Sequence, residues 1–374
     1  MPVTTSTNLQ VTYRLHCATG EDPAAKAAGI ALEQTVELPM ACVPDHLRDH
    51  WVGQVRQLEP IDADTWRCRI DYAADLVGEH WSQCLNLLFG NISLQDGILI
   101  DTIDWPESVL RRFGGPGFGI HGLRHLAGVS EQRALTCTAL KPVGLDADAL
   151  ADRARLFAEA GIDLIKDDHG LADQPAAPFA ARLAACQAAV TAANQRTGGT
   201  SLYLPNVTAP SRLLDARLAA ARDAGCKAVL LCPWLCGLDS LAHARDRFGL
   251  AVMAHPALTG SHFRPRHGLT PALLLGEIFR LAGADAVIYP NVGGRFGFTL
   301  DTCQSINHNL RRPLGTIRPA LPTVGGGMEL DQAAEWGQRY GADTILLIGG
   351  SLYRHPDLLQ AARRFTKSLL AGHS

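Results

Sequence analysis

From about residue 134 onward, the chain alternates short apolar or β-branched runs with longer alanine-rich stretches of helical periodicity. Each run is short enough for a buried strand and is followed by ten or more residues of helical pattern, such as 146–160 and 271–282. The eight predicted strands are 135–141, 164–169, 202–207, 228–233, 251–255, 286–289, 321–324 and 344–348. Eight successive strand-helix units predict a (β/α)₈ barrel, with an open doubly wound sheet as the alternative.

The pattern ahead of the barrel is different. Strands are predicted at 11–17, 35–38, 66–72 and 98–103, and helices near 23–32 and 74–88. This order is typical of a small α+β domain. We therefore expect an α/β protein of two domains, an α+β domain at 1–125 and a barrel at 126–374, joined through the glycine-rich stretch 111–119.

Composition excludes several classes of protein. The net charge is −3 and the arginines are scattered, so the sequence has no basic field for nucleic acid. No apolar run reaches the roughly 18 residues of a membrane span, and the N-terminus lacks the layout of a signal peptide. We expect a cytoplasmic protein that binds neither nucleic acid nor membrane. The ten cysteines, including the Cys232 and Cys236 pair, are interpreted as reduced structural thiols.

Chemistry-bearing residues gather where the predicted strands end. Only five of the 34 basic residues are lysines, and two of these, Lys141 and Lys166, end predicted strands. In (β/α)₈ barrels the catalytic residues stand at the carboxyl ends of the strands. The residues at these ends are Lys141, Lys166, Asp167, Asp168, His169, Asn206, His255, Tyr289, Asn291, the glycines 325–327 with Met328, and Gly349 with Gly350.

Two of these groups have a simple physical use. The glycines after the seventh and eighth strands expose backbone amides, and barrels commonly bind phosphate at that corner. On an extended segment, Lys166 and Asp168 face the same way and His169 follows at the turn. Oxygen and imidazole ligands in this arrangement can hold a divalent cation. The alternative is an internal ion pair between Lys166 and an aspartate.

With these motifs in order along eight strands, the chain resembles the RuBisCO large subunit and its RuBisCO-like relatives of form IV. The Lys-Pro pair at Lys141 resembles the family's first-strand motif, which implies a catalytic acid-base lysine. The segment around Lys166 resembles the second-strand motif, which implies a carbamylated lysine that joins two carboxylates on Mg²⁺. Lys166 and Asp168 match this motif, and His169 stands where the family has glutamate.

The resemblance assigns the remaining strand ends as well. Asn206 matches an asparagine near the metal, and His255 matches the fifth-strand histidine of the family. The residues that match one phosphate site are Gly327, Gly349 and Gly350. The segments at Glu33 and Asn91 resemble those that a partner subunit lends to the active site, which implies a homodimer with shared sites.

Departures from the family pattern restrict the reaction. The loop 291–298 has no lysine, which carboxylation requires there in true RuBisCO. Pro256, Tyr289 and Gly325 replace the cationic and polar residues of the second phosphate site. We expect a monophosphorylated substrate whose other end contacts an altered pocket that includes Tyr289. Arg295 either reaches that end or is a solvated loop residue.

The machinery that remains is suited to enolisation. The predicted function is that of a metal-dependent, non-carboxylating enzyme acting on a monophosphorylated keto-sugar, as an isomerase of the 5-methylthioribulose-1-phosphate type. The alternative is a lyase, a decarboxylase of a 3-oxo sugar-acid phosphate of the 3-oxo-isoapionate-4-phosphate type. Two other classes stay open: a Schiff-base aldolase that uses Lys141 or Lys166, and a non-catalytic binding protein.

Overall fold

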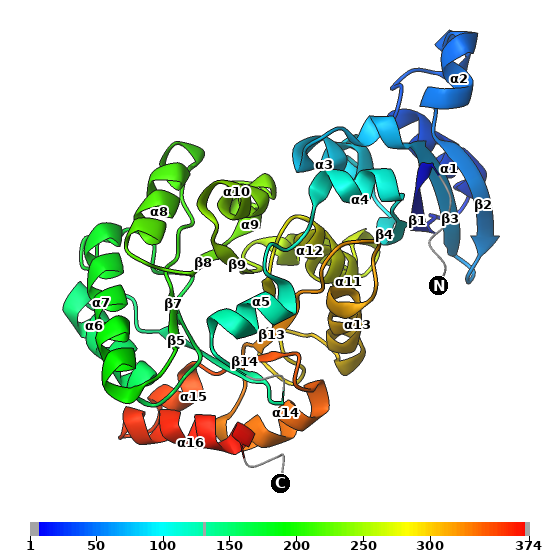
Figure 1. Ribbon diagram of the computed structural model, residues 1–374. Helices are drawn as coiled ribbons and strands as arrows, with labels where there is room; N and C mark the ends of the chain where they lie inside the picture. Colours follow the sequence, from blue (N-terminus) through cyan, green and yellow to red (C-terminus); the bar gives the residue numbers. More distant parts are fainter. Residues whose placement is uncertain (1–6, 130–131, 371–374) are drawn as a thin grey trace.

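The computed structural model describes residues 7–129 and 132–370, and its larger part is a barrel of parallel strands (Figure 1). The strands are β5 (Leu135–Leu140), β6 (Leu164–Asp167), β7 (Leu202–Leu204), β8 (Ala228–Leu231), β9 (Ala251–Ala254), β12 (Ala286–Pro290), β13 (Leu321–Gly325) and β14 (Ile345–Leu347). Their order is β7-β6-β5-β14-β13-β12-β9-β8, and a bridge between Asn206 and Leu230 joins the two ends. The predicted barrel is confirmed, and the open doubly wound sheet is wrong.

Helices surround the barrel on the outside (Figure 1). They are α6 (Ala147–Glu159), α7 (Phe179–Thr197), α8 (Ser211–Asp223), α9 (Pro233–Cys236), α10 (Asp239–Phe248), α11 (Pro271–Leu273), the π-helix η5 (Leu274–Ile278), α12 (Phe279–Leu281), α13 (Leu300–Arg311), α14 (Ala333–Tyr340), α15 (Gly350–Tyr353) and α16 (Leu358–Leu370). Side-chain caps set several starts: Asp146 accepts from the amide of Ala149, and Thr299 from that of Thr302.

Alternate strand residues fill the barrel interior. Leu135, Leu164 and Met253 belong to one buried cluster, which α5 (Gly119–Leu126) closes at the bottom with Ile120 and Leu123. Because side chains alternate along a strand, the same inward phase continues upward to positions 141, 166, 168 and 255. The core therefore determines which side chains reach the mouth. The domain boundary between residues 125 and 126 stays a prediction.

The N-terminal part is an α+β layer, as predicted. Its six-stranded sheet has the order β10-β11-β4-β1-β3-β2. The strands are β1 (Asn8–His16), β2 (Gln54–Pro60), β3 (Thr65–Ala73), β4 (Ile98–Asp104), β10 (Phe263–Arg264) and β11 (His267–Leu269). The helical segments are α1 (Pro23–Glu33), η1 (Met40–Cys42), α2 (Asp45–Trp51), η2 (Ala74–Val77), α3 (Trp81–Phe89), η3 (Asn91–Leu94) and α4 (Glu107–Phe113). Since β10 and β11 come from the loop after β9, this sheet connects the two parts of the chain.

Three predictions for the N-terminal part are wrong in detail. Residues 35–38 form no strand, because the amides of Thr35, Val36 and Glu37 all donate to the carbonyl of Leu32 and terminate α1. β2 was missed, since it is a mostly exposed edge strand without an alternating apolar pattern. The single helix at 74–88 is two segments, η2 and α3, separated at Gly78, whose φ is +68°.

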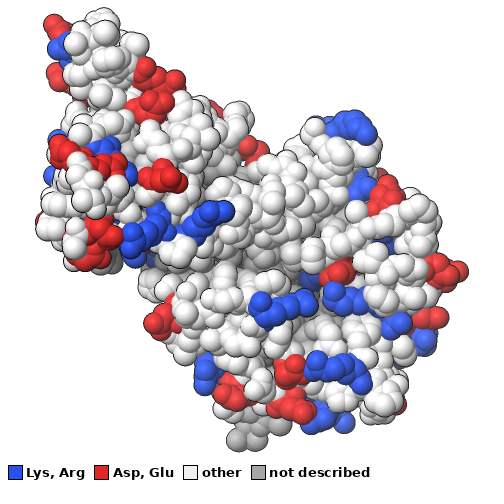
Figure 2. All heavy atoms as spheres, turned by 180° about the vertical axis from the view of Figure 1, so that it is seen from behind, with Lys and Arg blue, Asp and Glu red and all other residues white. Residues whose placement is uncertain are grey.

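The predicted linker is partly helical, since 111–113 end α4 and 119 begins α5. All ten cysteines are free of disulfides. On the face in Figure 2, acidic and basic side chains are interspersed over both parts of the molecule. Within residues 7–129 and 132–370, no helix combines the length and apolar composition that crossing a membrane requires.

Candidate active site

Lys141 and Asp168 form an ion pair at the mouth of the barrel. They follow the neighbouring strands β5 and β6, whose register pairs Ala139 with Lys166. The ammonium nitrogen of Lys141 lies 2.8 Å from Oδ1 of Asp168, and the two side chains are 35% and 14% exposed. The pair is therefore within reach of a ligand that enters the mouth.

Lys166 lies deeper in the barrel than this pair. Its side chain is buried, at 2% exposure, and Nζ donates to the carbonyl of Asp167 at 3.0 Å. Burial lowers the pKa of Lys166, although the nearby carboxylate of Asp168 opposes this effect. Burial thus shifts this amine toward its neutral form, which is both a nucleophile and a base.

Asp168 is held in its charged form. Burial acts to raise the pKa of Asp168, but contacts with His169 and Lys141 and the charge of Lys166 outweigh it, so the pKa lies far below its usual range. The imidazole of His169 stacks on that of His255, with ring centroids 4.1 Å apart. Burial, with the charge of Lys166, also lowers the pKa of His255 well below its usual value. His255 is therefore neutral at pH 7.

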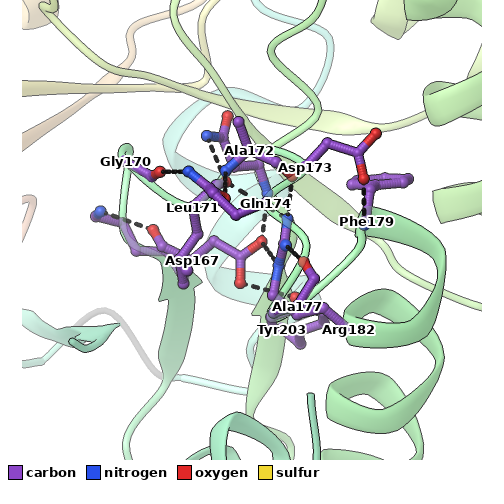
Figure 3. Close-up of polar contacts among 12 residues, drawn as sticks. Asp167, Gly170, Leu171, Ala172, Asp173, Gln174, Ala177, Phe179, Arg182 and Tyr203 are labelled. Atoms are coloured by element: carbon purple, nitrogen blue, oxygen red, sulfur yellow. Dashed lines mark hydrogen bonds and ion pairs between the residues drawn. The ribbon is translucent and has the colours of Figure 1, made fainter. Parts of the chain in front are cut away.

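The side chain of the neighbouring Asp167 points away from the barrel interior, where it joins a buried hydrogen-bond network. It is fully buried and accepts from Arg182 Nε at 3.0 Å, from the hydroxyl of Tyr203 at 2.8 Å and from the amide of Asn206 at 2.9 Å. Figure 3 shows this carboxylate beside the arginine at the start of α7. These contacts fix the outward side of β6.

The same network holds the loop that carries Asp168 and His169. Arg182 donates to the carbonyls of Ala177 and Ala172 at 2.7 and 2.8 Å, so the loop folds over its guanidinium (Figure 3). The side-chain amide of Asn206 donates to the carbonyl of His169 at 3.0 Å. Asn206 therefore lies beside the loop of Asp168 and His169, and its side-chain amide nitrogen supports that loop.

The glycines after β13 and β14, at 325–327, 349 and 350, form one corner of the barrel mouth, the glycine corner. This corner lies next to Lys141. The Cβ position of Gly349 would be 3.7 Å from Cε of Lys141, so the backbone there is within reach of anything that touches the amine. Gly327 has φ of +106°, and a Cβ there would lie 2.8 Å from Cα of Gly294. A side chain at 327 would therefore clash with the loop after β12. Both features suit backbone amides that a ligand approaches closely.

Two predicted contact residues lie apart from this cluster. Tyr289 is buried on the outer side of β12, where its hydroxyl contacts Oδ1 of Asn307 on α13 at 2.5 Å. The inward positions of β12 are Ala286 and Ile288, so Tyr289 faces the helix layer. Arg295 lies on the loop after β12, with its guanidinium 5.3 Å from the ring centre of Phe296.

Glu33 and Asn91 lie outside the barrel, in the N-terminal part. Nδ2 of the Asn91 side chain donates to Oε1 of Glu33 at 2.9 Å, in an exposed position. α1 ends at Glu33, and η3 begins at Asn91. The structure thus brings these two residues together with each other.

Lys166, Asp168 and His169 are the potential ligands of a divalent cation at the barrel mouth. The described residues contain no group of three or more His, Cys, Asp or Glu side chains arranged around one point. Asp168 and His169 supply one carboxylate and one imidazole, and the buried amine of Lys166 is a third position that becomes an oxygen ligand when it carries CO₂. These residues fit a cation when Lys166 is in that anionic form, because the pair alone contributes one negative charge.

Comparison with known proteins agrees with this arrangement. The sequence profile described as "Ribulose bisphosphate carboxylase large chain, catalytic domain" matches residues 109–367. The chain belongs to the RuBisCO large-chain family. It is 43% identical, over 94% of its length and 93% of the relative's, to a protein named 5-methylthioribulose-1-phosphate isomerase from Rhodospirillum rubrum. It is 41% identical, over 98% and 99% of the two chains, to Ribulose bisphosphate carboxylase-like protein 1 from Rhodopseudomonas palustris.

A solved structure extends the similarity to the whole RuBisCO-like fold. The Rubisco-like protein from Rhodopseudomonas palustris has a TM-score of 0.89 at 37% identity and covers 99% of both chains. The predicted family, fold and enzymatic, non-carboxylating nature are confirmed. Because relatives over nearly the full length carry enzyme names, the non-catalytic alternative is set aside.

Proposed function

We propose that this RuBisCO-like enzyme isomerises 5-methylthioribulose 1-phosphate by moving a proton between carbons. The observation that carries the proposal is the Lys141–Asp168 ion pair of 2.8 Å beside the glycine corner, above the buried Lys166. The 43% identical relative of that name supports the choice of substrate. An isomerisation balances without a co-reactant, since one proton leaves a carbon next to the carbonyl and one returns to another carbon.

The residues divide the work by position. The backbone at Gly327, Gly349 and Gly350 holds the single phosphate, and places the reacting carbons over Lys141. Asp168 keeps the lysine amine in place through their ion pair. Lys141 is the group that moves the proton at carbon. Neutral His255, whose Nδ1 accepts from the amide of Ala257, donates its Nε2–H to a substrate oxygen.

We assign Lys166, Asp168 and His169 as the ligands of a Mg²⁺ ion, with Lys166 carbamylated. The lowered pKa of Lys166 favours reaction of the neutral amine with CO₂. A bound cation would stabilise the negative oxygen that develops when the carbon loses its proton. Asn206 supports this centre indirectly, through its hydrogen bond to the carbonyl of His169.

At the opposite end of the substrate, none of Pro256, Tyr289 and Gly325 supplies a cationic side chain for a second phosphate. A Cβ on Gly325 would lie 2.9 Å from Cδ2 of Leu347, so that side of the pocket is filled. Tyr289 faces α13, and Pro256 offers no donor. An uncharged tail therefore suits this end, and we assign its contact to Arg295, because the Tyr289 side chain faces the helix layer. Carboxylation is excluded by the missing lysine in loop 291–298.

We further propose a cytoplasmic homodimer with shared sites. Glu33 and Asn91 form an exposed pair outside the barrel of their own chain, and we assign them to the partner's active site. The second candidate reaction, decarboxylation of a 3-oxo sugar-acid phosphate, would use the same enolate. No contact of the described residues favours it over isomerisation. The Schiff-base alternative would use Lys141 or Lys166 as a nucleophile.

Product analysis tests the proposal. Purified enzyme with Mg²⁺ and bicarbonate is incubated with 5-methylthioribulose 1-phosphate, and ³¹P and ¹³C NMR follow the phosphate ester. We expect an isomeric monophosphate of unchanged composition and no release of CO₂. Turnover of the 3-oxo acid phosphate with release of CO₂, and none of the methylthio sugar, would establish the lyase instead. A substrate adduct trapped by borohydride on either lysine would establish the aldolase.

A further inference from the structure

Tyr353 connects the glycine corner to the end of β5. It is the last residue of α15, the short helix that begins at Gly350. Its hydroxyl donates to the carbonyl of Ala139 at 2.9 Å and accepts from the amide of Lys141 at 3.1 Å. One side-chain oxygen thus satisfies two backbone groups on either side of Leu140.

This hydroxyl takes the place of a missing strand residue. In the ladder between β14 and β5, the amide of Ile348 donates to the carbonyl of Cys137 at 3.0 Å. A parallel ladder would next use residue 350, with its amide toward Ala139 and its carbonyl toward Lys141. At that point the chain leaves the sheet to form α15, and the tyrosine hydroxyl makes both contacts instead. Gly350 is therefore free of the sheet, while the carbonyl of Ala139 and the amide of Lys141 keep hydrogen-bond partners.

The ring of Tyr353 is held firmly from the side of α6. The ring of Phe157 packs edge-on against it, with centroids 5.8 Å apart and an interplanar angle of 85°. The guanidinium of Arg153 lies 5.3 Å from the ring centre. The position of the hydroxyl is consequently fixed by the barrel's helix layer.

α15 itself has a separate attachment. The hydroxyl of Ser351 donates to Oε2 of Glu329 and accepts from the amide of Leu330, both at 3.0 Å. These contacts join the corner to the loop after β13. Loss of the tyrosine hydroxyl therefore leaves the glycines anchored while it releases β5.

We propose that Tyr353 is a positioning residue that fixes the backbone at Lys141, and so the place of its amine, as the chain turns away to form the phosphate corner. This rests on the proposed function in one respect, the role of Lys141 in proton transfer. The contact itself does not depend on the substrate.

The test compares Tyr353→Phe with the wild-type holoenzyme. Because misplaced proton-transfer groups cost about 10- to 100-fold in rate, we expect kcat for 5-methylthioribulose 1-phosphate to fall by that factor. KM and the dissociation constant of inorganic phosphate should stay within about threefold, since the corner keeps its own anchor. Ser351→Ala is the matched variant with the opposite expectation. In this variant KM should rise and phosphate binding should weaken by larger factors than kcat falls. Tyr13→Phe, which removes a buried hydroxyl 2.9 Å from Tyr72, should leave all three constants unchanged.

A measurement without substrate keeps the two proposals apart. Hydrogen-deuterium exchange at the amide of Lys141 should accelerate by about three- to tenfold in Tyr353→Phe, the loss of one hydrogen bond. Unchanged exchange, or unchanged kcat with faster exchange, would overturn the positioning role. Equal losses in kcat and phosphate binding would make Tyr353 a merely structural residue. If wild-type enzyme fails to turn over the sugar phosphate, the proposed function fails, and the exchange experiment still decides whether the contact holds Lys141.

Discussion

At the scale of single residues, the site keeps an amine in a place that does not favour its charge. Lys166 is fully buried, and its lowered pKa reflects the cost of removing an ammonium from water. Each unit of such a shift corresponds to about 1.4 kcal/mol. A residue that contributed to stability alone would not be a lysine here. The free-energy cost of burying this amine therefore indicates that Lys166 has a role in function.

Lys166→Met should therefore be inactive and more stable than the wild type at pH 7. The sign follows from proton binding. Between the folded pKa and the unfolded value of about 10.4, the unfolded chain binds a proton that the folded chain does not, so wild-type stability rises with pH. The advantage of the variant should shrink from pH 7 to 9.5 in urea titrations. A variant less stable than wild type at both pH values would contradict this account.

At the scale of elements, the structure shows which features the sequence can specify. The strands of the barrel are apolar runs of the right length, and residues at their carboxyl ends, such as Lys141 and Asp168, could be located from that pattern. Strand alternation also predicts the outward position of Tyr289, because Ala286 and Ile288 face inward. The apolar alternation of this strand in the sequence therefore already places Tyr289 away from the mouth.

Other parts of the site depend on contacts across the chain. Asp167 and Arg182 are 15 residues apart, and Lys141 and Tyr353 are 212 apart. No local pattern pairs such residues, because their proximity follows from closure of the barrel. The sequence feature that could have indicated this pair is Arg182, near the start of the alanine-rich helix α7. An arginine buried there needs a carboxylate partner.

The loop network gives a stability prediction at this scale. Arg182→Met should destabilise the protein by about 3–5 kcal/mol, because it leaves the Asp167 carboxylate buried without a cation. Adding Asp167→Asn should recover part of this loss. In the exposed Arg339–Glu335 pair, Arg339→Met should cost under about 1 kcal/mol. Denaturant unfolding measures all three, and equal effects for the buried and exposed pairs would refute the role given to the network.

At the scale of the whole molecule, the N-terminal sheet and the barrel are joined by strand pairing and by a buried hydrogen bond. β11 from the barrel loop pairs with β4, and Nε1 of Trp105 donates to the buried Glu277 at 2.6 Å. Figure 1 places the remaining N-terminal strands beyond this junction. A rigid junction of this kind can present Glu33 and Asn91 to a second copy of the chain.

Shared sites predict complementation between inactive variants. Glu33→Gln and Lys166→Ala proteins, unfolded and refolded together, should recover about a quarter of wild-type activity. Random pairing makes about half of the dimers mixed, and each mixed dimer contains one intact composite site of its two. Each variant refolded alone is the control. No recovery in mixtures shown by mass spectrometry to contain mixed dimers would place both residues' functions within one subunit.

The central claim is that the strand ends of this barrel enolise a monophosphorylated keto-sugar without fixing CO₂. Deuterium incorporation from D₂O into 5-methylthioribulose 1-phosphate, followed by ¹H NMR, tests it most directly. We expect exchange at a carbon beside the carbonyl with wild-type enzyme, and a rate at least about 100-fold lower with Lys141→Ala. Absence of exchange in wild type, full exchange in the variant, or formation of radiolabelled phosphoglycerate from ribulose bisphosphate and labelled CO₂ would contradict the account.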